Sequence, residues 1–374
     1  MPLRNARGRL ALALTAVLLV PLAPGTAAVA AAPAAAAAPS KIMIVGDSIT
    51  HGSSGDYTWR YRLAQHLGAA ADFVGPSSGL YDPVRSAGNV IVESTAYAVP
   101  GFDHDHGARW GRFLGSWPGY YTGANDTIEA DVRAYQPAYV VVLLGINDLF
   151  WFNTVEPSVV AQEMADFVTN ARAGKSNVRL VLAAIPSTRG AQLDATLRGR
   201  VADYNARLAA LATARTTTAS PVVYVPQPAG YQADYDVSPH DSYDGTHPNA
   251  RGELRIADAV ADVLAAKFGL GTAFALSLTG VPVGPVLPVT LTCTPGNGQV
   301  TLSWTESPGA TGYWYQQRVA GGAWEPPVYQ LTMANSPMPS VWLTNGVTYE
   351  YRLQAAKMYD KGVFSNTCSA TPTA

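Results

Sequence analysis

Short apolar runs rich in Val, Ile and Leu alternate with longer amphipathic stretches over the first two thirds of the chain. The apolar runs predict buried strands at 42–45, 71–75, 140–144, 178–186 and 222–225. The amphipathic stretches predict helices at 127–135, 157–173, 196–211 and 250–267. Strands that alternate with helices predict a parallel sheet covered by helices on both faces.

The pattern changes in the last quarter of the chain. Residues 269–288 are rich in Gly, Pro, Leu and Thr and contain no charged side chain, which predicts a linker. Beyond it, short alternating strands separated by turn residues predict an all-β, immunoglobulin-like sandwich, with strands at 299–304, 312–318 and 347–355.

The first residues predict an export signal. A basic start is followed by an apolar stretch at 10–22, which is too short for a comfortable membrane span, and by an Ala-rich tract at 27–38. We therefore expect a signal segment over 1–38 and a secreted protein with no membrane span in the mature chain. An N-terminal membrane anchor is the alternative reading of the same residues.

Composition narrows the possible partners. The 374 residues are 48% hydrophobic and 14% charged, with a formal net charge of −2, which gives no electrostatic basis for nucleic-acid binding. The plentiful Tyr and Trp residues are compatible with neutral substrates such as sugars or esters. The two cysteines, Cys293 and Cys368, predict one disulfide in an exported chain, and two free buried thiols are the alternative.

Polar residues follow two of the predicted strands in a way that suggests catalysis. Ser48 follows the first strand in Gly46-Asp47-Ser48, and Asn147 follows the strand at 140–144. Because ligands bind at the carboxyl ends of the strands in such sheets, a nucleophile and an oxyanion donor can meet there. The alternatives are that Ser48 is only a turn residue and that Asn147 caps the next helix.

A late loop offers the general base. His247 comes just before the helix at 250–267, and Asp244 lies three positions earlier, where it can hold one ring N–H and fix the tautomer. His240 and Asp241 form a rival pair, but no anchoring Pro-helix pattern follows them.

Taken together, the strand ending in Gly46-Asp47-Ser48, the Gly-x-Asn-Asp segment at 145–148 and the late Asp-x-x-His resemble the SGNH (GDSL-type) hydrolase family over roughly residues 41–268. The resemblance implies a three-layer α/β/α, flavodoxin-like domain over 39–269. It also implies a serine esterase that works through an acyl-enzyme without metal or cofactor. The implied catalytic residues are Ser48, Asp244 and His247, and the implied oxyanion hole is formed by Ser48, Gly101 and Asn147, with Gly88 as the competitor of Gly101.

The substrate is less sharply defined. The Gly46–Thr50 stretch and the Tyr/Arg-rich helical pattern after it are similar to carbohydrate esterases that remove acetyl groups from xylan. Trp110, Trp117 and Tyr120 are candidate substrate contacts or a local hydrophobic plug. The alternatives for function are a lipase or phospholipase of the same family and a non-catalytic glycan-binding protein. The alternating Asp and His residues at 103–106 predict a solvated loop, with a metal site as the alternative.

The C-terminal segment, over 288–374, resembles a fibronectin type III domain joined by a linker at 270–287. Trp304 matches the core Trp of that family, and Leu343 and Tyr349 match the residues of its tyrosine corner. The resemblance implies either a tether to polysaccharide or an inert spacer. We expect a monomer whose partner is an ester substrate, either an acetylated polysaccharide or a lipid ester.

Overall fold

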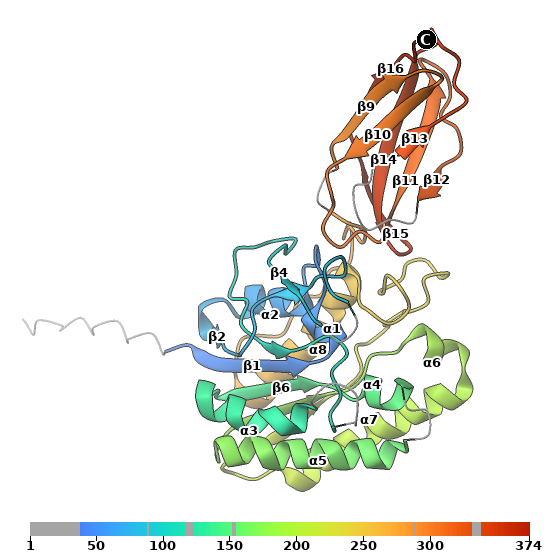
Figure 1. Ribbon diagram of the computed structural model, residues 1–374. Helices are drawn as coiled ribbons and strands as arrows, with labels where there is room; N and C mark the ends of the chain where they lie inside the picture. Colours follow the sequence, from blue (N-terminus) through green and yellow to red (C-terminus); the bar gives the residue numbers. More distant parts are fainter. Residues whose placement is uncertain (1–37, 88–89, 117–122, 152–154, 287–288, 331–337) are drawn as a thin grey trace, which may run out of the picture. The chain divides into compact units, whose positions relative to one another are not determined.

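The computed structural model describes residues 38–374 apart from 88–89, 117–122, 152–154, 287–288 and 331–337 (Figure 1). Residues Ala38–Ala374 form one compact unit.

In the described part of the chain, six strands form a parallel sheet. Five of them lie in the order β2-β1-β6-β7-β8, and β5 pairs with β1 beyond the end of β2. Their bounds are β1 (Ser40–Gly46), β2 (Ala71–Phe73), β5 (Gly107–Ala108), β6 (Tyr139–Leu143), β7 (Arg179–Ala183) and β8 (Val222–Val225). The predicted parallel sheet is therefore confirmed.

Helices cover both faces of this sheet. Their bounds are α1 (Ser48–His51), α2 (Trp59–Leu67), α3 (Ala124–Tyr135), α4 (Ile146–Trp151), α5 (Pro157–Gly174), α6 (Arg189–Leu193), α7 (Ala195–Arg215) and α8 (Ala250–Phe268), with a 3₁₀ turn at Gly68–Ala70. Helices α2 and α8 pack together on one face, and α3, α5 and α7 lie side by side on the other (Figure 1). The result is a three-layer α/β/α architecture.

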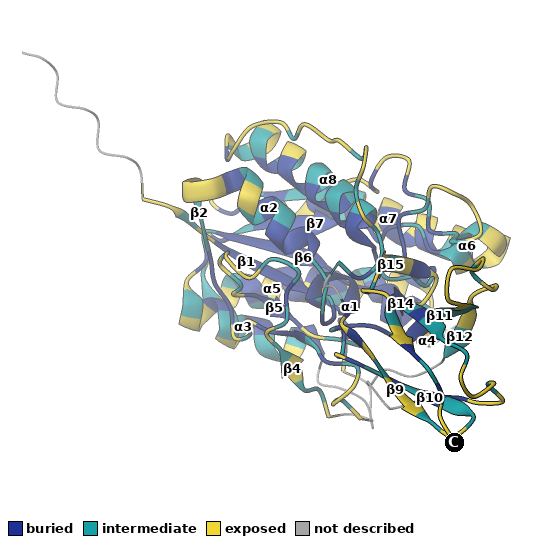
Figure 2. Ribbon diagram, turned by 90° about the horizontal axis from the view of Figure 1, so that it is seen from above, coloured by how far each residue is buried: buried dark blue, intermediate teal, exposed yellow. Residues whose placement is uncertain are grey.

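The sheet is buried on both sides because its strands have no polar face. The consecutive residues Ile42 to Val45 of β1 are all at most 2% exposed, although successive side chains of a strand point to opposite faces. Only helices on both faces can bury such a strand. Figure 2 shows these strands as the buried centre between helices that keep an exposed outer side.

The sequence did not predict the short pairings around β1. Strands β3 (Leu80–Tyr81) and β4 (Glu93–Ser94) pair with each other, and β5 follows His106 directly. His106 is fully buried, with Nε2 2.9 Å from the carbonyl of Gly79 and Nδ1 accepting from the N–H of Ala108. The expectation of a solvated loop is thus wrong at this histidine, because the segment leads into a strand of the central sheet.

The C-terminal strands form two antiparallel sheets, one of order β13-β10-β9 and one of order β12-β11-β14-β15 with β16 paired to β14. Their bounds are β9 (Leu291–Gly296), β10 (Gln299–Trp304), β11 (Gly312–Val319), β12 (Val328–Gln330), β13 (Met338–Ser340), β14 (Tyr349–Lys357), β15 (Asp360–Phe364) and β16 (Cys368–Ala370). Alternate residues of β10, among them Val300, Leu302 and Trp304, enter a shared core with Tyr351 and Leu353 of β14. This pattern is consistent with the predicted sandwich.

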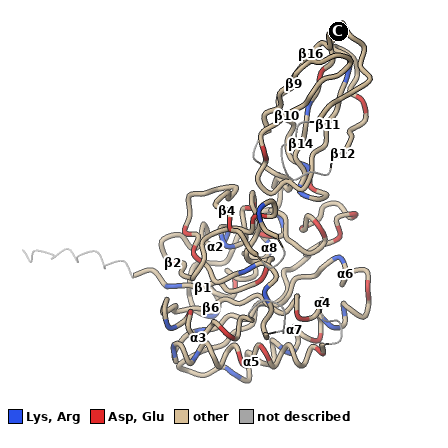
Figure 3. The backbone as a smooth tube through the Cα atoms, in the orientation of Figure 1, with Lys and Arg blue, Asp and Glu red and all other residues tan. Residues whose placement is uncertain are grey.

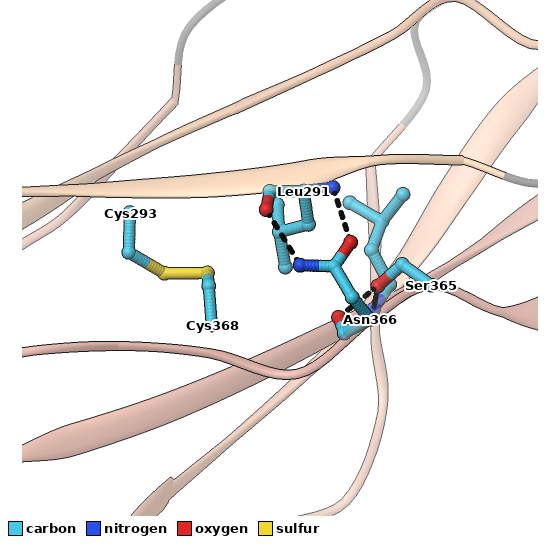
Figure 4. Close-up of a disulfide and its surroundings, with 6 residues drawn as sticks. Leu291, Cys293, Ser365, Asn366 and Cys368 are labelled. Carbon is cyan, nitrogen blue, oxygen red and sulfur yellow. Dashed lines mark hydrogen bonds between the residues drawn. A yellow bond between two sulfur atoms is a disulfide. The ribbon is translucent and has the colours of Figure 1, made fainter.

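Two kinds of bond join elements of this region. A disulfide between Cys293 and Cys368 connects β9 to β16, as predicted, which excludes the free-thiol alternative (Figure 4). Beside it, the Asn366 side chain bonds both the N–H and the carbonyl of Leu291.

Charged residues of both signs are interspersed along the described chain (Figure 3). Several lie in pairs, such as Arg189 with Asp234 and Arg318 with Glu350.

Candidate active site

Ser48 lies at the first turn after the central strand β1. A side chain at Gly46 would place its Cβ 2.2 Å from Thr50 Oγ1, so only glycine fits where the strand turns into α1. Asp47 caps this turn, because its Oδ1 accepts from the N–H of Ile49 at 2.9 Å. Ser48 is 6% exposed, and its hydroxyl makes no hydrogen bond to another described residue. No hydrogen bond to a described residue therefore fixes the orientation of this hydroxyl.

Asp244 and His247 form a hydrogen-bonded pair in the loop before α8. Asp244 Oδ2 lies 2.6 Å from His247 Nδ1, and Oδ1 accepts from the N–H groups of Thr246 and His247. Burial raises the pKa of Asp244, but the charge of His247 and these hydrogen bonds outweigh it and hold the pKa below its usual value. An ionised Asp244 keeps a proton on Nδ1 and leaves Nε2 as the reactive nitrogen of the ring.

Trp110 connects this pair to the Ser48 turn. Its ring stacks on His247 at a centroid distance of 4.5 Å and on Tyr81 at 4.2 Å. Its backbone N–H donates to His51 Nδ1 at 2.9 Å, and His51 is the last residue of the helix that Ser48 begins. Trp110, predicted as a substrate contact, thus forms part of the wall of the site.

His51 acts here as a neutral acceptor. Burial lowers the pKa of His51 to about 3, and the charges of Arg60 and Arg109 add to that effect. The contact between His51 Nε2 and Glu93 at 3.7 Å is therefore not an ion pair at neutral pH.

Asn147 lies in the first turn of α4, at the end of β6. Its Nδ2 donates to the carbonyl of Arg112 at 2.9 Å, and its Oδ1 accepts from Trp151 Nε1 at 3.1 Å. The Trp151 bond fixes which end of the amide is the donor. One Nδ2 hydrogen remains for a ligand, since an amide NH₂ has two. The side chain makes no capping bond, so the structure does not support the helix-cap alternative.

No contact among the described residues joins Gly101 to Ser48 or Asn147. It is exposed, and two residues later Asp103 accepts from the N–H of Phe73, which pairs with Ile42 in the first half of β1. This bond ties the segment after Gly101 to the edge of the sheet near the start of β1. The competitor Gly88 and the predicted contacts Trp117 and Tyr120 lie outside the described residues.

Gly111 is a second glycine to consider, because its chain neighbours contact His247 and Asn147. It has φ +72° and lies between Trp110, whose ring contacts His247, and Arg112, whose carbonyl accepts from Asn147. Its N–H makes no hydrogen bond to another described residue. Two residues of β5, Gly107–Ala108, place this segment beside Val45 and Gly46. A strand of two residues leaves no periodic pattern, so the sequence offered no signal for it.

Asp148 and the rival pair have structural contacts. The buried carboxylate of Asp148 accepts from the N–H of Leu114 at 3.2 Å and so supports the segment after Gly111. Asp241 pairs with Arg255 at 2.9 Å rather than with its neighbour His240. His240 bonds Asp360 instead.

The described residues contain no group of three His, Cys, Asp or Glu side chains placed to hold a metal ion. Within the same residues, no helix combines the length and apolar character of a membrane span.

Asp47 makes the stability of the site depend on pH. Burial raises its pKa to about 7, and the hydrogen bond from Ile49 opposes this only in part. Its Oδ2 is buried and has no hydrogen-bond partner among the described residues. The folded chain therefore binds this proton more tightly than the unfolded chain, whose carboxyl titrates near 3.8. The stability associated with this proton is complete below pH 3.8 and is lost as pH rises through about 7.

We expect Asp47→Asn to remove this pH dependence. Asparagine keeps the capping oxygen but does not ionise. The free energy of unfolding of the variant minus that of the wild type should therefore rise by up to about 4 kcal/mol between pH 4 and pH 9. Denaturant unfolding of both proteins across that range measures the difference. The raised pKa of Glu253 is common to both proteins and cancels. A difference that does not change with pH would contradict the account of Asp47.

Comparisons with known proteins identify the family of the chain. The sequence model of the GDSL-like Lipase/Acylhydrolase family matches residues 44–255, more than half of the chain. A multidomain esterase of Ruminococcus flavefaciens is 25% identical over 253 residues, which cover 65% of this chain and 30% of that protein. The chain spans less than a third of the length of the curated relatives that it matches.

Two solved structures are also similar. An acetyl esterase mutant with an acetate ion is 25% identical, with a TM-score of 0.44, and the match covers 61% of this chain and 97% of that one. A carbohydrate esterase family 3 protein from Talaromyces cellulolyticus is 24% identical, with a TM-score of 0.43 and coverage of 61% and 97%. On the match of the family model, the chain belongs to the GDSL-like lipase/acylhydrolase family.

Proposed function

We propose that this protein is a secreted serine esterase that hydrolyses carboxylic esters through an acyl-enzyme, with acetylated carbohydrate as its substrate. The observation that carries the proposal is the 2.6 Å Asp244–His247 pair stacked on Trp110, whose own N–H bonds the helical turn that begins at Ser48. The match to a multidomain esterase supports the reaction class.

In the proposed reaction, Ser48 Oγ attacks the ester carbonyl while His247 Nε2 takes the hydroxyl proton. Asp244 stabilises the imidazolium that forms and keeps the ring oriented. His247 then returns the proton to the leaving alcohol, and the acyl group stays on Ser48. Water, deprotonated by His247, attacks the acyl-enzyme in the same way and releases the acid.

The developing oxyanion would be held by three N–H donors. We assign them to the backbone of Ser48, the backbone of Gly111 in place of Gly101, and Asn147 Nδ2. The bonds of Asn147 to Arg112 and Trp151 fix the direction of its amide before substrate arrives. Such preorganised donors stabilise the transition state, and each is typically worth about 3 kcal/mol.

Exposed aromatic surface beside the site supports a carbohydrate substrate. Trp151 is 67% exposed although its Nε1 bonds Asn147, so its ring lies at the mouth of the site. A flat aromatic ring can pack against the apolar face of a sugar. We therefore add Trp151 to Trp110 as a candidate substrate contact.

A panel of esters tests this function. We expect the full chain to release acetate from acetylated xylan and to prefer p-nitrophenyl acetate over p-nitrophenyl octanoate and phospholipid. A preference for acyl chains of eight or more carbons would instead identify a lipase or phospholipase. Binding of acetylated xylan without hydrolysis of any ester would identify a non-catalytic glycan-binding protein.

We also propose that the C-terminal strands form a fibronectin type III domain over 288–374. Trp304 is buried in its core, and the Tyr349 hydroxyl accepts from the N–H of Thr344 at 3.1 Å, the bond expected of a tyrosine corner. The remaining assignments of the chain are a signal segment over 1–38, a catalytic region over 39–269, a linker over 270–287 and a monomeric state.

A further inference from the structure

The turn between β14 and β15, residues 357–360, buries charged side chains against the loops of the candidate active site. Lys357 is 7% exposed and Asp360 is 2% exposed. Buried charges persist only where they are paired and hydrogen-bonded, so they favour one arrangement of their partners. We call this segment the β14–β15 turn.

Asp360 bonds both ends of the loop that carries Asp244 and His247. Its Oδ1 lies 2.6 Å from His240 Nε2, and its Oδ2 accepts from Asn249 Nδ2 at 3.0 Å. The same Nδ2 also lies 3.2 Å from the carbonyl of His240. One carboxylate thus joins His240, the first residue of the loop at 240–249, to Asn249, which caps α8.

A second set of contacts reaches the middle of the loop. The N–H of Tyr359 donates to the carbonyl of Tyr243 at 3.3 Å, and the N–H of Tyr243 donates to the carbonyl of His247 at 3.1 Å. The Tyr359 ring stacks on Tyr235 at a centroid distance of 3.7 Å. Two successive backbone hydrogen bonds, through Tyr243, therefore connect the turn to the carbonyl of His247.

Lys357 connects the turn to the loop that follows Ser48. Its Nζ pairs with the Asp56 carboxylate, lies 3.5 Å from the carbonyl of Ser54 and sits 4.6 Å from the centre of the Tyr243 ring. Asp56 in turn accepts from the N–H of Ser53 at 2.7 Å. The same short turn thus touches the loop of the candidate nucleophile and the loop of the candidate base.

We infer that the β14–β15 turn is a positioning element for catalysis, with Asp360 as its main positioning residue. It fixes the Asp244–His247 loop relative to the loop after Ser48. The inference rests on the proposed esterase function. The loop at 240–249 has no helix or strand of its own, so its geometry depends on such ties. A displacement of about 1 Å between reacting groups can cost about 100-fold in rate.

The test compares Asp360→Ala, Asp360→Asn and Lys361→Ala in the full chain. Alanine removes both bonds, and asparagine can keep only one acceptor. Lys361 lies next to Asp360, but it is exposed and its Nζ lies 3.9 Å from the centre of the Trp314 ring, so Lys361→Ala is the matched control. Steady-state hydrolysis of p-nitrophenyl acetate, thermal melting and amide hydrogen exchange over 240–249 are measured for each.

We expect kcat to fall about 10- to 100-fold in Asp360→Ala and less in Asp360→Asn, with KM nearly unchanged. Exchange over 240–249 should rise in the same order, while Lys361→Ala should match wild type. Wild-type kcat in a folded Asp360→Ala would overturn the inference, and so would a change in KM alone.

The exchange measurement separates failure of this inference from failure of the proposed function. If the wild-type chain hydrolyses no ester, the esterase proposal fails. Unchanged exchange in Asp360→Ala or Asp360→Asn would then show independently that the turn does not hold the loop. Raised exchange in those two variants, but not in Lys361→Ala, would support the conclusion that the turn holds the loop at 240–249.

Discussion

Replacing Ser48 with alanine is expected to lower kcat for ester hydrolysis by at least about 10⁴-fold, because the acyl-enzyme can no longer form. What hydrolysis remains would come from water attacking an ester bound at the donors of Gly111 and Asn147. KM should change little, since the hydroxyl contributes mainly to the reaction and not to binding. Steady-state kinetics on p-nitrophenyl acetate measure both quantities.

The fold should tolerate this change. The Ser48 hydroxyl makes no hydrogen bond to another described residue, so its removal leaves no partner unsatisfied, and the free energy of unfolding should change by less than about 1 kcal/mol. Ser78→Ala is the matched control, because Ser78 is exposed and has no role in the proposed reaction. Hydrolysis at the wild-type rate by Ser48→Ala would remove Ser48 from the mechanism.

The second large effect is expected for Asp244→Asn, which should lower kcat by about 10³- to 10⁴-fold. Asp244 uses one oxygen for the N–H groups of Thr246 and His247 and the other for His247 Nδ1. An asparagine has only one acceptor oxygen. If that oxygen keeps the backbone bonds, its NH₂ group faces Nδ1 and favours the tautomer with the proton on Nε2, which cannot act as a base.

The charge of Asp244 contributes as well, because a neutral amide cannot stabilise the imidazolium that forms in the transition state. Asp236→Asn provides the control, since Asp236 is 65% exposed in the same region and pairs with Arg189. The measurement is kcat of both variants, with unfolding curves to confirm that each is folded. Equal kcat in Asp244→Asn and wild type would contradict the assigned role.

The sequence predicted the parallel sheet because its strands are continuous apolar runs. Runs such as 140–144 can be buried only between two layers, and the structure buries them there. The same logic placed Ser48 and Asn147 each at the end of a strand. The structure adds that these strands, β1 and β6, are neighbours, so both chain segments leave the sheet at the same edge. The Asp244–His247 pair was predicted from its spacing, because a side chain three positions before a histidine can reach the imidazole ring.

Backbone donors and long-range contacts were harder to predict. An oxyanion donor from the main chain carries no side-chain signature, so Gly101 was chosen by position. The two-residue strand β5, which leads to Gly111 and to the Arg112 carbonyl that bonds Asn147, left no pattern to read. Trp151 was not singled out because its role depends on one bond to Asn147. The bonds of Asp360 join residues more than a hundred positions apart, and no local pattern encodes them.

Labelling of the full chain with a serine-directed phosphonate, followed by peptide mass spectrometry, shows whether Ser48 is the nucleophile. We expect a single adduct on Ser48, absent from Ser48→Ala and formed much more slowly in Asp244→Asn. An actively hydrolysing protein that carries the adduct on another residue, or none at all, would contradict it.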